Sequence, residues 1–278
     1  MATNNDELLF GFPEEWRDFR KRHVLFFERF PHLADALNTA FIRTGRSMEP
    51  IDRFVFLYGR LCAEDFSEIL LCCGNGYGAA AMKLVRTLYE RAVTLRYLHD
   101  NPEGLTDFLD YFHVAKYKQW VAIKETFGQN AFSEEMNKSI EAEYRGVKEK
   151  FMVTDCEQCG TRKLNHTWNK LDFVAMAKKT GSLGRLIVPG YYTPMRHGHS
   201  TLGALLSRLE ETEMGGISFK PYAQRGMADD ALMTAQNVIF AVLRIQAERF
   251  DVPGLNEKLD TCEQDFLDIY RGNRNWLT

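Results

Sequence analysis

Apolar side chains recur along most of this chain at the i, i+3, i+4 spacing of an amphipathic helix. The pattern predicts helices at about 12–30, 31–44, 49–73, 78–99, 102–127, 132–151, 169–181, 193–211, 228–250 and 255–271. Strand patterns are scarce, and only the run GGISFKPY at 215–222 is interpreted as a short extended piece. Since no repeat or linker interrupts the pattern, the chain is interpreted as a single all-α multi-helix bundle over residues 1–278.

Composition fits this interpretation. The 278 residues are 45% hydrophobic and carry a formal net charge of −3, so any nucleic-acid contact requires a local basic patch. The N-terminus has no basic and apolar leader, and no apolar run reaches the roughly 20 residues of a membrane span. We therefore expect a cytoplasmic protein that makes no membrane contact, with its six cysteines reduced.

The middle of the chain is basic. Residues 162–208 hold eight Lys or Arg side chains against one Asp, a formal excess of +7, together with His166, His197 and His199. One interpretation is a site for phosphate or another anion. The other is a solvated face that is neutralised by acidic helices such as the one at 133–144.

The helix at 78–99 has the clearest pattern. Met82, Val85, Tyr89 and Val93 form one apolar line, and Arg86 and Glu90 stand beside it at the i, i+4 spacing of an ion pair. The pair is interpreted either as structural or as a carboxylate held for catalysis. The preceding GNGYG at 74–78 follows a helical run, which favours a helix break or close packing over a phosphate loop.

The run GYYTPMRHGHSTL at 190–202 combines aromatic, basic and imidazole side chains. Thr193 before Pro194 predicts an N-cap and the start of a long helix. On that helix Leu202, Leu205, Leu206 and Leu209 would form the core stripe, with His199 on the same stripe as a hydrogen-bonded core histidine.

His197 would lie on the polar face of the same helix. In the first turns of a helix the dipole favours the neutral imidazole, which is the form that a general base requires. Arg196 beside it makes the helix start a natural anion site. The sequence therefore predicts His197 as the best single catalytic candidate, with a plain structural role as the alternative.

The run CEQCG at 156–160 resembles half of a zinc site. Cys156, Cys159 and His166 are weak candidate ligands, because structural zinc requires four and no second cysteine pair follows. Loop thiols without metal are the default interpretation, so no cofactor is predicted, and zinc stays an alternative.

The run GAAAMKLVRTLYERAVTLRYL at 78–98, with Arg86, Leu88 and Glu90 in order, resembles the signature helix of an uncharacterised all-helical bacterial family, domain of unknown function 5677. Trp168, Met176, Ala177, Tyr192 and His197 continue the resemblance, which covers about 55–210, and Thr193 stands near where that family tends to have Ser. It implies a helical bundle and no established activity.

A weaker similarity reaches the nucleotide-binding helical domains abbreviated HEPN. Many of these are ribonucleases with an Arg and a His four to six residues apart on one helix, whereas here the histidines follow Arg196 after one and three residues. This similarity implies a HEPN-like core, with extra helices at both ends of this chain, and binding of RNA or a nucleotide.

Three functional hypotheses follow. In the first, the 78–99 helix and the start of the 193–210 helix line a basic cleft for RNA or a nucleotide. Metal-independent cleavage there would use His197 as base, Arg196 on the phosphate and Glu90 to orient its neighbours. The anion would also contact Arg86, Tyr192, Thr193 and His199.

The second hypothesis is a binding or regulatory module without catalysis, such as a component of a defence or toxin–antitoxin system. The third is a metal enzyme built on the Cys/His cluster. A homo-oligomer is expected, because helical proteins of this size often associate through apolar faces.

Overall fold

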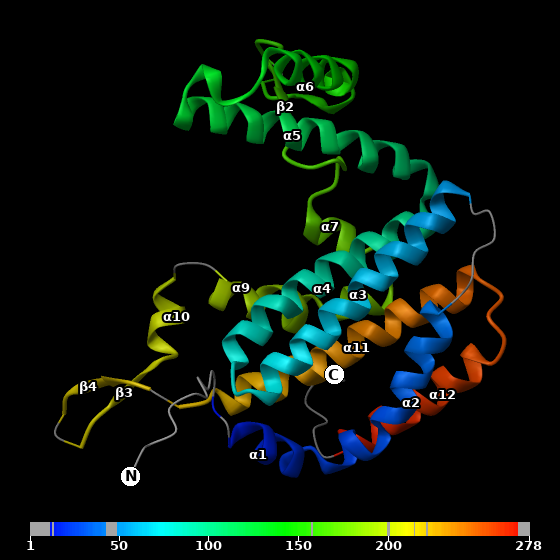
Figure 1. Ribbon diagram of the computed structural model, residues 1–278, viewed down its shortest axis with the longest axis vertical. Coiled ribbons are helices and arrows are strands. Elements are labelled where there is room, and N and C mark those ends of the chain that lie inside the picture. The colour runs from blue at the N-terminus through cyan, green and yellow to red at the C-terminus, as the bar shows by residue number, and fades with distance from the viewer. Residues whose placement is uncertain are drawn as a thin grey trace, which may run out of the picture. The chain divides into compact units, whose positions relative to one another are not determined.

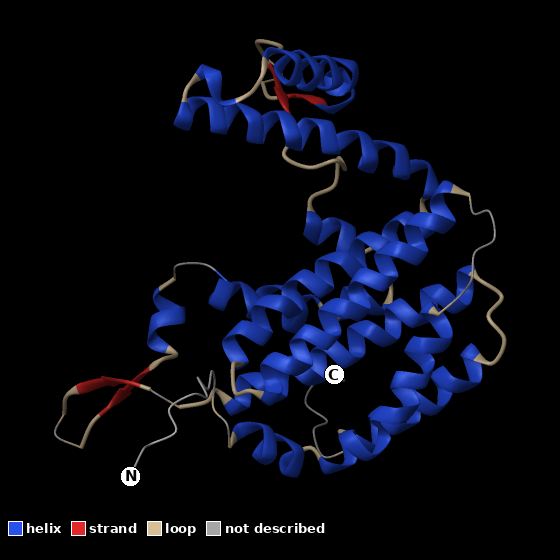
Figure 2. Ribbon diagram, viewed as in Figure 1, coloured by secondary structure: helices blue, strands red, loops and turns tan. Residues whose placement is uncertain are grey.

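The computed structural model describes residues 12, 14–42, 49–156, 158–198, 201–213, 215–220 and 222–271, without the side chain of Gln129 (Figures 1 and 2). The chain divides into two compact units. Unit 1 comprises Met1–His99 and Ala177–Thr278, and unit 2 comprises Asp100–Met176. The single domain expected over 1–278 stays a prediction.

Unit 1 is built from long helices. Its elements are α1 (Glu15–Arg22), α2 (Val24–Phe41), α3 (Pro50–Gly74), α4 (Gly78–Asp100), α8 (Ser182–Arg185), the π-helix η4 (Val188–Tyr192), α9 (Thr193–Gly198), α10 (Leu202–Leu206), β3 (Leu209–Glu211), β4 (Ile217–Phe219), α11 (Arg225–Arg249) and α12 (Leu255–Ile269). The short α7 (Phe173–Ala177) leads into this unit from unit 2.

Unit 2 has fewer elements. They are the 3-10 helix η1 (Pro102–Gly104), α5 (Leu105–Phe127), η2 (Gln129–Ala131), α6 (Glu134–Val147), η3 (Lys148–Phe151), β1 (Met152–Thr154) and β2 (Arg162–Leu164). In the described part of the chain, strands are confined to two antiparallel pairs, β1–β2 and β3–β4. The all-α class is thus confirmed, and β4 lies within the predicted extended piece. Within the same residues, no helix combines the length and apolar character that crossing a membrane requires.

Helix α11 forms the centre of unit 1. It is buried on most sides and packs along α3, as Figure 1 shows. Gly59 of α3 lies against the buried side chain of Gln246, where a Cβ would collide with the amide nitrogen. That nitrogen donates 2.8 Å to the carbonyl of Val55, so the buried amide is not left unpaired. The glycine therefore permits a close approach of the two helices.

The glycine-rich turn between α3 and α4 is a packing device, as the sequence predicts. A Cβ on Gly74 would collide with the ring of Trp16, and one on Gly78 would collide with backbone atoms of Gln224 and Ala228. The backbone N–H of Gln224 donates 3.0 Å to the carbonyl of Gly76, which ties this turn to the start of α11.

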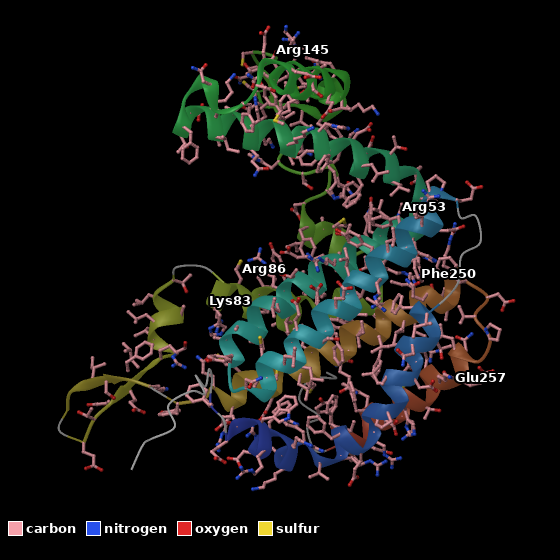
Figure 3. All side chains as sticks on the ribbon, viewed as in Figure 1. Arg53, Lys83, Arg86, Arg145, Phe250 and Glu257 are labelled. Carbon is pink, nitrogen blue, oxygen red and sulfur yellow. The ribbon has the colours of Figure 1, made fainter. Side chains whose placement is uncertain are left out.

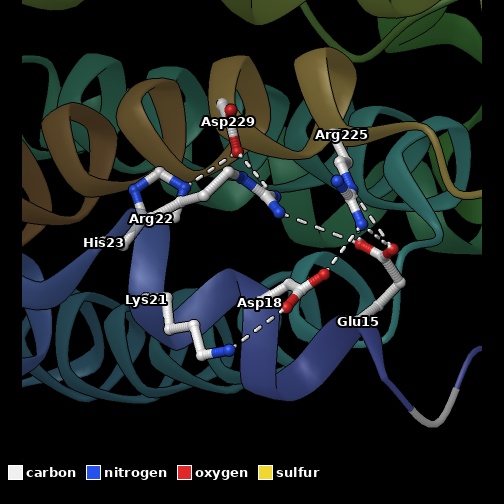
Figure 4. Close-up of polar contacts among 7 residues, drawn as sticks. All are labelled: Glu15, Asp18, Lys21, Arg22, His23, Arg225 and Asp229. Carbon is white, nitrogen blue, oxygen red and sulfur yellow. Dashed lines mark hydrogen bonds and ion pairs between the residues drawn. The ribbon is translucent and has the colours of Figure 1, made fainter.

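Charged side chains fasten α1 to α11 (Figure 4). Arg225 donates 2.5 Å to Glu15 and 3.0 Å to Asp18. One helical turn along α11, the Oδ1 of Asp229 accepts from His23 at 2.8 Å and from Arg22 at 3.3 Å. Burial raises the pKa of Asp229, but His23 and Arg22 outweigh it, so the pKa ends below its usual value.

Unit 2 has its own small core between α5 and α6. The rings of Tyr117 and Tyr144 stack 3.8 Å apart, and Trp120 donates 2.7 Å to the side chain of Asn137. Ser133 caps α6 by accepting 3.2 Å from the backbone N–H of Met136.

Two predicted helix boundaries need correction. Within the helix expected at 169–181 only α7 is helical, and it starts late because Asp172 caps the N–H of Ala175 at 2.7 Å and Asn169 bonds the N–H of Leu171 at 3.1 Å. Such side chains compete with the helical hydrogen bonds. The helices expected at 12–30 and 31–44 are divided at His23, where the backbone leaves the helical region.

Candidate functional site

Helix α4 carries the predicted apolar line and a polar face. Met82, Val85, Tyr89 and Val93 are all buried, as expected. Arg86 lies one turn from Lys83, and both are labelled in Figure 3. The Nε of Arg86 donates 2.8 Å to the Oε1 of Glu90, so the predicted i, i+4 ion pair is present.

A tyrosine that the sequence analysis did not single out completes the environment of Arg86. The guanidinium carbon lies 4.6 Å from the ring centroid of Tyr191, and Nη2 lies 3.5 Å from its hydroxyl. With Glu90 at its edge and an aromatic ring at its face, Arg86 is held in one orientation. Glu90 keeps two fifths of its side chain exposed.

The segment that carries Tyr191 is fixed on α4 by the ring of Tyr89. The hydroxyl of Tyr89 donates 2.9 Å to the carbonyl of Leu183 in α8. A Cβ on Gly190 would lie 2.7 Å from the Cγ and Cδ2 atoms of the same ring. Because Gly190 has no side chain, η4 approaches α4 closely enough to place Tyr191 over Arg86. The ring of Tyr192, which is 41% exposed, meets Tyr191 edge-on at 5.5 Å.

Thr193 does not cap a helix, contrary to the prediction. Its φ of −63° and ψ of −48° are helical, and η4 continues through it into α9. The helix predicted over 193–211 ends at Gly198, and Thr201 is the true cap of the next helix, since its side chain accepts 3.1 Å from the N–H of Ala204. Thr193 therefore lies inside a helical run, next to Tyr192 in sequence.

His197 lies near the C-terminal end of α9, so the helix dipole does not explain a neutral imidazole. Its pKa is nevertheless lowered below 6.5, by burial first and then by repulsion from Arg196 and Lys83. The predicted direction is therefore present with a different cause. The influence of Lys83 indicates that α9 lies within electrostatic reach of the polar face of α4.

The leucine stripe expected beyond His197 is wrong. Leu202, Leu205 and Leu206 are 68%, 51% and 56% exposed, because α10 is a separate short helix that does not pack into the core. Leu209 is half-buried in β3. His199, predicted on that stripe and as an anion contact, lies outside the described residues.

The basic middle of the sequence divides into paired and unpaired cations. In unit 2, Arg162 pairs with Glu149 at 3.1 Å and Lys163 with Asp155 at 2.5 Å. In unit 1, residues 177–198 contain no acidic residue. Among the residues that the structure describes, no acidic side chain pairs with Lys83, Lys178, Lys179, Arg185 or Arg196, and all five are exposed.

These five unpaired cations and two residues beside them, Arg86 and His197, form a set that we call the basic face. It consists of Lys83, Arg86, Lys178, Lys179, Arg185, Arg196 and His197. The contacts of Tyr89 with Leu183 and Gly190 hold the segment 177–198, which carries five of these residues, on α4. Lys83 and Tyr191 were missed from the sequence, although Lys83 stands one turn before Arg86, a spacing that could have indicated it.

A cavity of about 640 Å³ in the same unit is a weaker candidate for an anion site. It is lined in part by Arg208, Lys220 and Arg225. Arg208 donates 2.6 Å to the carbonyl of Lys220, and Arg225 is paired with Glu15 and Asp18. Since two of its three cations are already engaged within the protein, the basic face is the better candidate for an anion site.

The cysteine motif lies in unit 2. Cys156 and Cys159 flank the turn between β1 and β2, and His166 lies exposed beyond β2. Within the described ranges, no group of three or more His, Cys, Asp or Glu side chains is placed to hold a metal ion. The zinc alternative gains no support from this geometry.

The fold and the basic face thus define an all-helical protein with an unneutralised cationic surface. The sequence model of a family of unknown function, DUF5677, matches residues 53–217, and the chain belongs to this family. The match confirms the resemblance expected over about 55–210 and includes Arg86, Glu90, Arg196 and His197. No curated protein and no solved structure matches the chain significantly. The HEPN-like similarity stays a prediction.

Proposed function

We propose that unit 1 binds single-stranded RNA on the basic face. The observation that carries the proposal is the set of exposed cations without acidic partners. Elsewhere in this unit many exposed or half-buried cations are paired, as Arg244 is with Asp260 and Glu263, and Lys258 with Asp35, whereas Arg20, Arg53 and Lys220 have no acidic partner among the described residues. The basic face differs because four of its unpaired cations, Lys178, Lys179, Arg185 and Arg196, lie in one segment without acidic residues.

Aromatic rings beside these cations favour a nucleic acid over a simple anion. Proteins that bind single strands combine a cationic track for phosphates with rings on which bases stack. Tyr192 offers an exposed ring, and Tyr191 is held against Arg86. Since the cations come from α4, α8, α9 and the segment before α8, a ligand with several phosphates gains more contacts than a mononucleotide.

The basic face also has the groups for metal-independent cleavage. His197, with its lowered pKa, is neutral at pH 7 and can take the proton of a ribose 2′-hydroxyl as this oxygen attacks the adjacent phosphorus. Arg196 would hold the phosphate oxygens as the 5′-oxygen leaves and takes up a proton from water. Glu90 would position Arg86 rather than touch the reacting atoms.

Binding is tested with a fluorescent single-stranded RNA titrated at several salt concentrations. In the Lys83→Ala/Arg196→Ala variant, affinity falls and the slope of log K against log salt decreases by about 0.7 for each lost phosphate contact. Arg17→Ala/Lys21→Ala removes two exposed cations that α1 pairs with its own acids, so affinity should not change. Equal losses in both variants would contradict the proposed face. Parallel titrations with a mononucleotide and with single-stranded DNA show which of these ligand classes the basic face binds.

Cleavage is tested on the same RNA with His197→Ala. Loss of cleavage with retained binding assigns the base to His197. Cleavage unchanged by the substitution removes His197 from the mechanism. Binding without cleavage by the unmodified protein favours the second hypothesis, a binding or regulatory module.

A further inference from the structure

The described residues of the loop between β1 and β2 include two cysteines, Cys156 and Cys159. The strands pair antiparallel in the register Met152↔Leu164 to Thr154↔Arg162. The backbone N–H of Asp155 donates 2.7 Å to the carbonyl of Thr161, and that of Gly160 donates 2.9 Å to the carbonyl of Cys156. Gly160 has a φ of +69°, which completes the turn without strain. Cys156 and Cys159 thus both lie within the turn that the bond from Gly160 to Cys156 closes.

The two thiols contact each other and a hydroxyl. The sulfur of Cys159 lies 2.8 Å from the Oγ1 of Thr161, and the thiol of Cys156 is a further hydrogen-bond partner. Hydrogen bonding by Thr161 first, and by Cys156 second, lowers the pKa of Cys159 to about 7. Charges on the adjoining strand and helix are already paired, Lys163 with Asp155 and Arg162 with Glu149.

The other four cysteines have the opposite character. Cys62, Cys73 and Cys262 are buried, and burial raises the pKa of each thiol. Cys72 is half-buried on α3, and its pKa is also raised, by burial and then by Glu68. Because the thiolate is the reactive form, the exposed Cys159 is singled out as the nucleophile.

We propose that Cys156 and Cys159 form a redox-active dithiol, which closes to an intramolecular disulfide by exchange with a small-molecule or protein disulfide. The bond from Gly160 to Cys156 closes a turn that contains both cysteines, and the two thiols are already hydrogen-bond partners, as a disulfide that spans about 4.4–6.8 Å between Cα atoms requires. Closure therefore requires no change in the β1–β2 register. This site is independent of the basic face, which belongs to the other unit.

The exchange balances with glutathione disulfide as oxidant. The thiolate of Cys159 attacks one sulfur, the glutathione S–S bond breaks, and one glutathione leaves and takes up a proton. Cys156 then gives up its proton and attacks the Cys159 sulfur of the mixed disulfide, which expels the second glutathione. The two thiols of the chain are oxidised to one disulfide, and glutathione disulfide is reduced to two thiols.

In the experiment, the reduced full-length chain is treated with glutathione disulfide at pH 7. The intact mass of the protein is followed, together with the thiols that remain free for alkylation. The unmodified chain should lose two hydrogens at Cys156 and Cys159. Cys156→Ser lacks the second thiol, so Cys159 should keep one glutathionyl group. Cys159→Ser should stay reduced on the same time scale. Dithiothreitol should restore both thiols of the unmodified chain.

Cys72 serves as the internal control. At pH 7, iodoacetamide should label Cys159 at least about fivefold faster than Cys72, since the larger thiolate fraction outweighs the lower nucleophilicity of a less basic thiolate. The proposal is overturned if the unmodified chain keeps both thiols in excess glutathione disulfide, or stops at a stable glutathionyl adduct. It is also overturned if the purified chain holds zinc that Cys156→Ser releases, because the pair would then be a metal site shared between copies.

Discussion

At the scale of single residues, Gly190 determines how closely the cationic segment approaches α4. The ring of Tyr89 is buried and its hydroxyl is bonded to Leu183, so it cannot turn away from an added methyl group. We expect Gly190→Ala to lower the free energy of unfolding by about 1–3 kcal/mol, the usual cost of overpacking. Urea unfolding measures the change. Gly198→Ala is the matched control, because a Cβ there meets no atom within 4 Å, and it should change stability by less than about 0.5 kcal/mol.

His197 reports the electrostatics of the basic face. Its NMR titration midpoint should lie below 6.5, because burial and then Arg196 and Lys83 disfavour the imidazolium. Arg196→Ala should raise the midpoint more than Lys83→Ala, and both together should leave it below 6.5, since burial remains. Lys21→Ala is the control and should not move it. A midpoint at or above 6.5 in the unmodified protein would contradict the described environment.

The lowered pKa of His197 also makes the stability of the protein depend on pH. The folded chain binds the proton of His197 less readily than the unfolded chain does, so this residue makes stability fall as the pH drops below about 6.5. Sequence reasoning reached the correct direction for this pKa through a helix dipole that α9 does not supply. The causes are burial, then Arg196 next to it in the sequence, and then Lys83 more than a hundred residues away. Of these, neither the burial nor Lys83 is encoded in the spacing of residues 190–202.

At the scale of elements, α11 carries two neighbouring carboxylates with opposite effects on stability. The pKa of Asp229 is lowered because His23 and Arg22 outweigh its burial, whereas the pKa of Asp230 is raised by burial and then by repulsion from Asp229. The contribution of Asp229 is complete above its unfolded pKa of about 3.8 and is lost as the pH falls through the lower folded value.

We therefore expect Asp229→Asn to destabilise the protein at pH 7, and to do so less at pH 3, because the unmodified protein has by then lost part of the same contribution. Asp230→Asn should slightly increase stability at pH 7, since it removes a charge that the folded state disfavours. Urea midpoints at both pH values measure these changes. Equal loss in the two variants at pH 7 would show that α1 and α11 are not held by this specific contact.

Elements differ in how well their sequence predicts them. The apolar line of α4 and its Arg86–Glu90 pair follow from spacing within one helix, and both are present in the structure. Leu202, Leu205 and Leu206 keep the same spacing yet are exposed, because burial requires a partner surface and periodicity does not supply one. The approach of Tyr191 to Arg86 likewise depends on Gly190 and Tyr89, which are far apart in the chain.

At the scale of the whole molecule, net charge and charge distribution lead to different predictions for binding to heparin. The chain has a formal net charge of −3, which alone would predict weak repulsion from a polyanion such as heparin. The unpaired cations of the basic face predict retention at low salt and elution as salt rises. Retention therefore indicates a local surface rather than the average of the protein.

Two variants with the same net charge decide between these predictions. Lys178→Glu/Lys179→Glu and Arg17→Glu/Lys21→Glu both take the formal charge from −3 to −7, and both act on exposed side chains of unit 1. The first pair lies in the acid-free segment 177–198, and the second stands beside Glu14 and Asp18, which already cancel its field. We expect the first variant to elute from heparin at clearly lower salt and the second to elute close to the unmodified protein. If both variants elute at the same salt concentration, affinity for polyanions follows total charge, and the basic face is not a distinct binding surface.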